Sequence, residues 1–217
     1  MPLAELTAAV VLSAVPWRTI RSRRGQRHLP GLYWSATTGG HVLYESRLEL
    51  ARLLLADFDS DVVGIAAQPL LVREEGRRHV PDFLLGRADG SVLFVNVKPA
   101  DRLARDEVAH ALAWAGRVFA ERGWEHEVWS GAHAQLLANV RFLAGYRRAA
   151  LLEPLTGGVD ALRTDGAALT IVGAEAALER AGVAEPRTVV LGLLWSGRLR
   201  AELERPLTGE TELEVQW

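Results

Sequence analysis

Residues 79–98 read HVPDFLLGRADGSVLFVNVK, and this stretch predicts two strands joined by a tight turn. Positions 79–85 are mostly apolar, and positions 91–97 are rich in β-branched and aromatic residues that favour extended backbone. Between them, Asp89-Gly90 supplies the left-handed conformations that a short turn needs. The stretch is therefore expected to form an antiparallel hairpin.

The predicted hairpin gathers polar groups at one end. Because side chains alternate along a strand, Asn96 and Lys98 are expected on one face, and strand pairing brings Asp82 beside them. The apolar residues of the same strand are expected to face the other way, into a core. Burying a carboxylate, a carboxamide and an ammonium without partners is costly, so this end is expected to meet a metal, water or a ligand.

These residue types suit phosphodiester hydrolysis. A carboxylate can hold a divalent cation, which polarises a phosphoryl oxygen and lowers the pKa of bound water. A lysine beside that carboxylate can stabilise or orient the attacking hydroxide. The alternative is an exposed surface hairpin with ordinary polar residues, because Pro81-Asp82 followed by a lysine is a pattern that often occurs by chance.

Other pieces of sequence lie around this hairpin in a set order. They read TTGG, ESRLEL, DFDSDVVGIAAQP, PDFLL and NVKPA. In order and spacing, over roughly residues 20–148, they resemble the TnsA-type transposase endonucleases, which belong to the PD-(D/E)xK restriction-endonuclease-like group. The resemblance implies an α/β fold with a mixed β-sheet flanked by helices. It also puts Glu49, Asp82 and Lys98 at the catalytic positions.

The resemblance implies a metal site at this end of the hairpin. Glu49 and Asp82 are expected to bind Mg²⁺ or Mn²⁺, with the Val97 carbonyl as a third ligand, and hard oxygen ligands suit those ions. Lys98 is expected to position or activate water.

Two amide side chains are expected to support the site. Gln68 matches a glutamine that recurs just before the catalytic hairpin in the family. The wider fold group usually has Glu or Asp two residues before the lysine, where this chain has Asn96. TnsA-type enzymes carry an uncharged amide there, so Asn96 favours that family. Glu45 lies one helical turn before Glu49 as a rival carboxylate, but the Ser-x-x-Glu pattern favours Glu49.

A basic segment precedes the hairpin. Residues 17–31 read WRTIRSRRGQRHLPG. One interpretation is a solvated basic loop. The other, which the nearby nuclease pattern favours, is an arm that contacts DNA phosphates without reading the base sequence. Its DNA-binding residues are predicted to be Arg21, Arg23, Arg24 and Arg27.

The composition limits the catalytic chemistry and the cellular location that can be expected for this chain. The 217 residues include no cysteine, which excludes disulfides, a thiolate zinc site and a cysteine nucleophile and fits a cytoplasmic location. The formal net charge is -2, so any attraction to DNA must come from local patches. No stretch is long and apolar enough to cross a membrane, and no membrane partner is expected.

The chain is expected to have three parts. Residues 1–30 form an N-terminal element and basic arm, 31–150 a restriction-endonuclease-like catalytic domain, and 151–217 a smaller domain. Within the catalytic domain, helices are predicted over 45–56, 103–123 and 135–148, and strands over 62–72, with Gln68-Pro69 inside, and 124–129. The segment Asp57–Asp61 is expected to end the first helix, and Gly123 to cap the second.

The C-terminal part has the pattern of a winged helix. It reads as a helix, a turn, a second helix and two strands around Thr208-Gly209. In many such domains the second helix enters a DNA groove. Here that helix is apolar and the wing is acidic, so this domain is expected to bind protein rather than DNA.

The expected function is that of a Mg²⁺-dependent DNA endonuclease subunit of a heteromeric transposase, which hydrolyses one strand of double-stranded DNA at the ends of a mobile element. By resemblance, its partners are a DDE-type transposase subunit and an ATPase regulator. One alternative is a stand-alone restriction- or repair-type nuclease of the same fold. The other is a non-catalytic module that binds DNA or protein, for which Asn96 is the main support.

Overall fold

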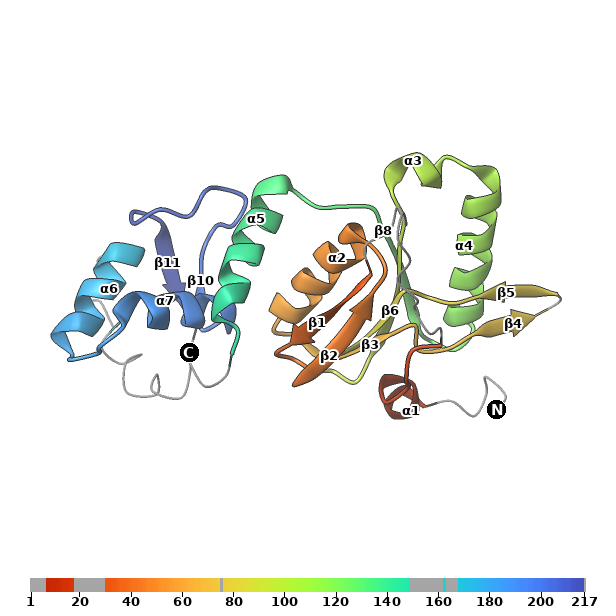
Figure 1. Cartoon of the computed structure of the whole chain (residues 1–217), viewed down its shortest axis with the longest axis horizontal. Coiled ribbons are helices and arrows are strands. Elements are labelled where there is room, and N and C mark those ends of the chain that lie inside the picture. Colours follow the sequence, from red (N-terminus) through yellow and green to blue (C-terminus); the bar gives the residue numbers. More distant parts are fainter. Residues whose placement is uncertain (1–6, 18–29, 75, 149–161, 163–167, 217) are drawn as a thin grey trace. The chain divides into compact units, whose positions relative to one another are not determined.

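The computed structural model describes residues 7–17, 30–74, 76–148, 162 and 168–216, and it divides into two compact units, Met1–Gly131 and Ala132–Trp217 (Figure 1). The division falls after Gly131, so helix α5 (Ala134–Leu143) belongs to the second unit. The boundary predicted at 150/151 lies outside the described residues. None of the helices in the described part has both the length and the apolar character needed to span a membrane.

A four-stranded mixed sheet forms the centre of the first unit. Its order is β3-β6-β7-β8, and only the β7–β8 pair is parallel. The strands are β3 (Val62–Ala67), β6 (Phe83–Arg87), β7 (Val92–Val97) and β8 (Glu125–Trp129). The flanking helices confirm the predicted α/β class with a mixed sheet, and β6–β7 confirms the hairpin.

The turn of the hairpin forms as its residues predict. Gly90 has φ +85° and the Ser91 amide donates to the Asp89 carboxylate at 2.8 Å. The first strand begins at Phe83, however, and not at His79 as predicted. Pro81 has no N–H to donate to a ladder, and His79 instead ends a different strand, β5 (Arg77–His79).

Both faces of the sheet are covered. Figure 1 shows α2 (Arg47–Phe58) on one side of the sheet and α4 (Asp106–Ala120) on the other. On the α4 side, Phe94 of β7 stacks on Phe119 with ring centroids 4.1 Å apart. Short helix α1 (Ala8–Leu12) adds Val11 to the same core. Asn96 follows Phe94 on this face, so it is fully buried, and every residue of β7 is buried.

The long helix predicted over 103–123 is two helices, α3 (Ala100–Leu103) and α4. Arg105 between them has extended backbone, with φ −88° and ψ 122°, so it interrupts the helix. Asp106 and Glu107 then occupy the first turn of α4, where the helix dipole favours negative charge. After α4, Gly123 has φ +69° and its amide donates to the Ala120 carbonyl at 2.9 Å, as its predicted capping role requires.

Asp57 lies at the end of helix α2 and is buried. Its carboxylate accepts hydrogen bonds from the Tyr33 hydroxyl at 2.6 Å, the Ser35 hydroxyl at 2.6 Å and the Thr37 amide at 2.8 Å. These donors belong to the hairpin of β1 (Gly31–Ser35) and β2 (Gly40–Tyr44) and to its turn. The helix ends at Phe58 with Asp59 as its C-cap, so the prediction that residues 57–61 end it is confirmed. The buried Asp57 carboxylate, with its several donors, is a tertiary anchor.

The strand predicted over 62–72 stops at Ala67. Gln68 has φ +46°, a left-handed conformation, and Pro69 has no N–H, so the extended backbone cannot continue. The prediction that Gln68-Pro69 lies inside a strand was therefore wrong. The chain instead forms a two-stranded ribbon from β4 (Val72–Glu74) and β5, which the sequence analysis did not predict.

The second unit contains the predicted helix–turn–helix and two strands. Its helices are α5, the 3₁₀ turn η2 (Ala144–Tyr146), α6 (Ile171–Arg180) and α7 (Pro186–Trp195), so the helix predicted over 135–148 ends early. Its sheet has the order β10-β11-β9, from β10 (Leu199–Arg200), β11 (Glu212–Val215) and β9 (Leu169–Thr170). Buried Asn139 on α5 donates to the carbonyls of Leu203 and Arg205 at 2.9 and 2.7 Å.

Candidate active site

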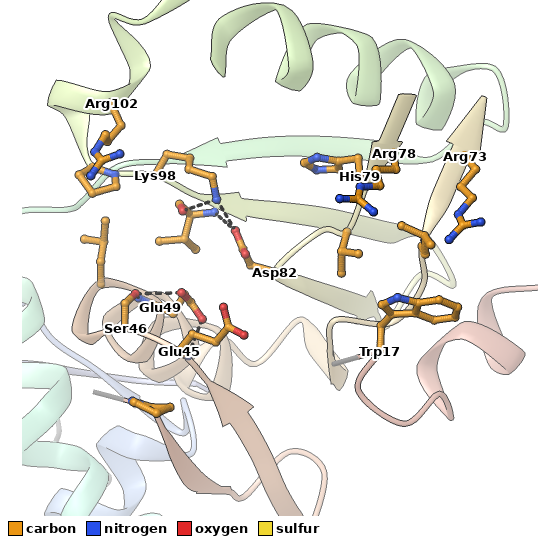
Figure 2. Close-up of a pocket in the computed structure, with 16 residues that line it drawn as sticks. Trp17, Glu45, Ser46, Glu49, Arg73, Arg78, His79, Asp82, Lys98 and Arg102 are labelled. Carbon is orange, nitrogen blue, oxygen red and sulfur yellow. Dashed lines mark hydrogen bonds and ion pairs between the residues drawn. The ribbon is translucent and has the colours of Figure 1, made fainter. Parts of the chain in front are cut away.

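A cleft of about 860 Å³ opens in the first unit beside the end of the β6–β7 hairpin. Figure 2 shows Asp82 and Lys98 above Glu45 and Glu49, which come from the start of α2. Val97 also lines this cleft. The structure thus brings the predicted metal ligands and the predicted catalytic lysine to one cavity. Asn96 and Gln68, the two predicted supporting residues, do not line it and are buried.

Asp82 is held from several directions. Its Oδ2 accepts hydrogen bonds from the Val97 amide at 2.7 Å, the Lys98 ammonium at 3.2 Å and the Asn96 amide at 3.3 Å. Its backbone N–H donates to Val95 and its carbonyl accepts from Gln68. All three contacts with the carboxylate reach Oδ2, and no described residue donates a hydrogen bond to Oδ1.

Lys98 lies between two of the three predicted metal ligands. Its Nζ is 3.2 Å from Asp82 Oδ2 and 3.0 Å from the Val97 carbonyl oxygen. The ammonium thus contacts two oxygens of the kind that hard metal ions prefer. Lys98 is also the single lysine among the chain's 25 Lys and Arg residues. Arginine serves at every other cationic position, whereas this one has the compact ammonium.

Glu49 combines a helix-capping role with a place in the cleft. Its carboxylate accepts from the Glu45 amide at 2.7 Å and the Ser46 hydroxyl at 2.9 Å, while the Glu49 amide donates to the Ser46 hydroxyl at 3.1 Å. These bonds resemble a capping box, except that the carboxylate accepts from the amide of the residue before the N-cap Ser46. Burial raises the pKa of the Glu49 carboxyl, and the charges of Asp82 and Glu45 raise it further, against the lowering by its two hydrogen bonds. A divalent cation would offset that crowding of negative charge.

The residues present therefore fit a hard divalent ion, with two carboxylates and one carbonyl as ligands. Glu45, which the sequence treated as the rival of Glu49, joins the cleft as a further carboxylate. Its Oε1 accepts from Gln68 Nε2 at 2.8 Å, so Gln68 acts on the site through Glu45. Within the described ranges no group of three or more His, Cys, Asp or Glu side chains forms a metal-binding set.

Asn96 connects Asp82 to two histidines. Its Oδ1 is 2.8 Å from His79 Nε2 and 3.0 Å from His126 Nε2. Because the Asp82 carboxylate only accepts, the Asn96 NH₂ must face it, and the carbonyl oxygen must face the histidines. Both Nε2 atoms therefore carry hydrogen. This network explains an amide at position 96, since it donates on one side and accepts twice on the other.

Neither His126 nor His79 was predicted as a site residue. Burial lowers the pKa of His126, and the neighbouring His79 lowers it further, against the raising by Glu127. The ring lies against Phe119, with centroids 5.5 Å apart. A Cβ on Gly116 would be 2.9 Å from His126 Nδ1, so glycine in α4 leaves the space for this ring. The contact with Phe119 and the absence of a Cβ at Gly116 hold the His126 ring in place, and that ring positions the Asn96 side chain.

His126→Phe tests whether this network positions Asp82. Phenylalanine fills the apolar space beside Phe119 but donates nothing to Asn96, and loss of such outer contacts typically lowers metal affinity or rate about 10–100-fold. We expect a fall of that order in Mn²⁺ affinity, measured by calorimetry, and partial rescue by His126→Gln, whose amide can donate. His110→Phe, an exposed position on α4, is the control. Unchanged affinity in a folded His126→Phe protein would exclude the positioning role.

The predicted DNA-binding arginines Arg21, Arg23, Arg24 and Arg27 lie outside the described residues. Other cations do line the cleft, namely Arg73, Arg78 and Arg102. A signal for the first two was present in VREEGRRH, where arginines flank a glycine turn. No protein-family model matches the chain, and no curated protein matches it.

Proposed function

We propose that this protein is a metal-dependent DNA endonuclease. The observation that carries the proposal is the Lys98 ammonium 3.2 Å from Asp82 Oδ2 in a cleft that Glu49 also lines. A carboxylate pair beside a lysine, at the end of a hairpin in a mixed sheet, is the arrangement that metal-dependent phosphodiester hydrolysis uses. The resemblance to TnsA-type endonucleases adds the proposed role, which is to cut one strand at the ends of a mobile element.

In this mechanism, Glu49, Asp82 and the Val97 carbonyl would hold Mg²⁺ or Mn²⁺. When bound, the ion polarises the scissile phosphate and lowers the pKa of the attacking water. Lys98 exchanges its contact with the Val97 carbonyl for the water or the phosphate and stabilises the charge that develops there. Asn96 keeps the Asp82 carboxylate in place throughout.

We propose that the second unit is a winged-helix-like domain that binds a protein partner. The order α6, α7, β10, β11 supports this layout, and β9 adds a third strand to the wing. Helix α7 is buried from Val189 to Trp195, so it presents no long polar face to a DNA groove. Exposed Glu212 and Glu214 on β11 would repel phosphates. A DDE-type transposase subunit and an ATPase regulator remain the proposed partners, by the family resemblance.

Cleavage by the wild-type protein tests the function. A supercoiled plasmid that carries candidate ends of a mobile element is incubated with the protein, with and without the proposed transposase and ATPase partners. We expect nicking in Mg²⁺ or Mn²⁺ and none in EDTA, with one strand cut at each end. Equal cutting without partners and at unrelated sequences would favour a stand-alone nuclease. Absence of nicking in every metal and partner condition would favour a non-catalytic module.

A further inference from the structure

The β4–β5 ribbon carries two arginines directly opposite each other. Arg73 of β4 pairs with Arg78 of β5 in the ladder, so their side chains leave the ribbon on one face. Both line the cleft, and Figure 2 shows both guanidinium groups beside the candidate site. Neither makes an ion pair with a described residue. Like charges directly opposite each other destabilise a strand pair, so this arrangement favours the binding of an anion.

The ribbon is fixed relative to the active site. On its other face, Val72 is buried in the core and the Glu74 carboxylate accepts a hydrogen bond from Trp114 Nε1 of α4 at 3.0 Å. At the end of the ribbon, His79 Nε2 is 2.8 Å from Asn96 Oδ1, and Asn96 in turn donates to Asp82. Val72, Glu74 and His79 therefore attach the ribbon at three points. The ribbon face that carries Arg73 and Arg78 is thus fixed relative to the candidate active site.

Cations lie on both sides of the carboxylates. Figure 2 shows Arg78 and Arg73 on one side of Asp82, and Arg102 of α3 on the other side, beside Lys98. Glu45, Glu49 and Asp82 occupy the middle of the same cleft. A single anion would need only one of these cationic ends. A chain of phosphates with one scissile group at the centre would use both, because its charges repeat every 3.4 Å or so along each strand.

Trp17 adds an aromatic surface at the same rim. Trp17 is 57% exposed, its backbone amide donates to the Gln68 carbonyl at 3.0 Å, and it lines the same cleft as Arg73 (Figure 2). An exposed indole in a cleft that arginines also line suits stacking on a base or sugar of a nucleic acid. An acidic peptide offers no regular partner for such a ring.

We infer that Arg73 and Arg78 bind the DNA backbone on one side of the scissile phosphate and Arg102 binds it on the other, so that the cut strand follows the cleft from the ribbon to α3. The inference rests on the proposed endonuclease function and names the surface that holds the substrate duplex. The three arginines belong to the first unit, and they are distinct from the arginines of the predicted basic arm.

Equilibrium binding separates this inference from catalysis. A fluorescein-labelled DNA duplex is titrated with the full chain in Ca²⁺, which supplies a divalent cation in place of Mg²⁺, and anisotropy is followed from low to physiological salt. For Arg73→Gln/Arg78→Gln we expect affinity to fall about tenfold or more at low salt. The slope of log affinity against log salt should fall by about 2, since two phosphate contacts are lost. The melting temperature should not fall, because like-charge repulsion is removed.

The charge-matched control is Arg117→Gln/Arg141→Gln, in which both arginines are exposed and neither lines the cleft. It should bind with nearly the wild-type affinity and slope. If the wild type binds the duplex and the Arg73/Arg78 variant keeps its affinity and slope, the inference is overturned while the endonuclease proposal stands. If the wild type does not bind the duplex even at low salt, the inference is overturned, while the endonuclease proposal is decided by the nicking assay with the partner proteins present.

Discussion

Lys98→Ala is expected to lose about a hundredfold or more in nicking rate, the scale seen when a preorganised electrostatic group is removed. Its ammonium contacts Asp82 Oδ2 and the Val97 carbonyl, and it is the one group of opposite charge hydrogen-bonded to the candidate metal ligands among the described residues. Its side chain is 33% exposed, so removal leaves no deep cavity. The melting temperature should therefore stay near the wild-type value. Rates are measured on the plasmid substrate with the partner proteins present.

Lys98→Arg sharpens this test. Arginine keeps the positive charge but presents a planar fork in place of a compact ammonium, so it cannot contact both oxygens and a water from one point. We expect it to remain strongly impaired while it folds and binds DNA. Arg87→Ala, on the opposite end of β6, provides a control for loss of a cation from the same sheet. Near wild-type nicking by folded Lys98→Ala would remove the lysine from the mechanism.

Asp82→Ala is expected to abolish divalent-metal binding in calorimetry, with a loss in Mn²⁺ affinity above the 10–100-fold typical of outer-shell changes. Asp82 supplies Oδ1, to which no described residue donates, and without Asp82 the proposed ligand set would keep a single carboxylate, that of Glu49. Removal also takes away the acceptor for the Val97 amide and for Asn96. Some loss of stability is expected from those unpaired donors, so folding is checked by thermal denaturation.

Asp82→Asn separates the two effects, because it keeps the shape and one acceptor oxygen while it removes the charge. It should fold better than Asp82→Ala and still bind Mn²⁺ poorly. Asp61→Asn is the control, an exposed carboxylate just before β3 that does not line the cleft. Equal Mn²⁺ binding by the wild type and Asp82→Asn would exclude Asp82 as a ligand.

The meeting of Asp82 and Lys98 could be predicted from the sequence because it depends on local geometry alone. An Asp-Gly turn and two strands of matched length set the register, and that register places the residue before β6 beside the end of β7. Glu49 was predictable only through the family resemblance. Its place in the cleft follows from the packing of α2 on the sheet, which no short-range pattern encodes.

Two features went against local expectation for one shared reason. Gln68 takes a left-handed backbone and Asn96 is fully buried. Each has a polar side chain whose ordinary place is a turn or a surface. Each is satisfied by partners far away in the sequence, and those hydrogen bonds outweigh the local preference.

The sequence by itself determined the hairpin, the α/β class and the pair of charged groups at the sheet end, because alternation and turn chemistry act over a few residues. Only the tertiary structure decided what surrounds that pair. His126 on β8 contacts Asn96 on the neighbouring parallel strand, in space that Gly116 leaves open. Arg73 and Arg78 face the cleft because the β4–β5 ribbon follows Gln68. Such contacts depend on how distant elements pack, and the energies that select them arise only when those elements are buried together.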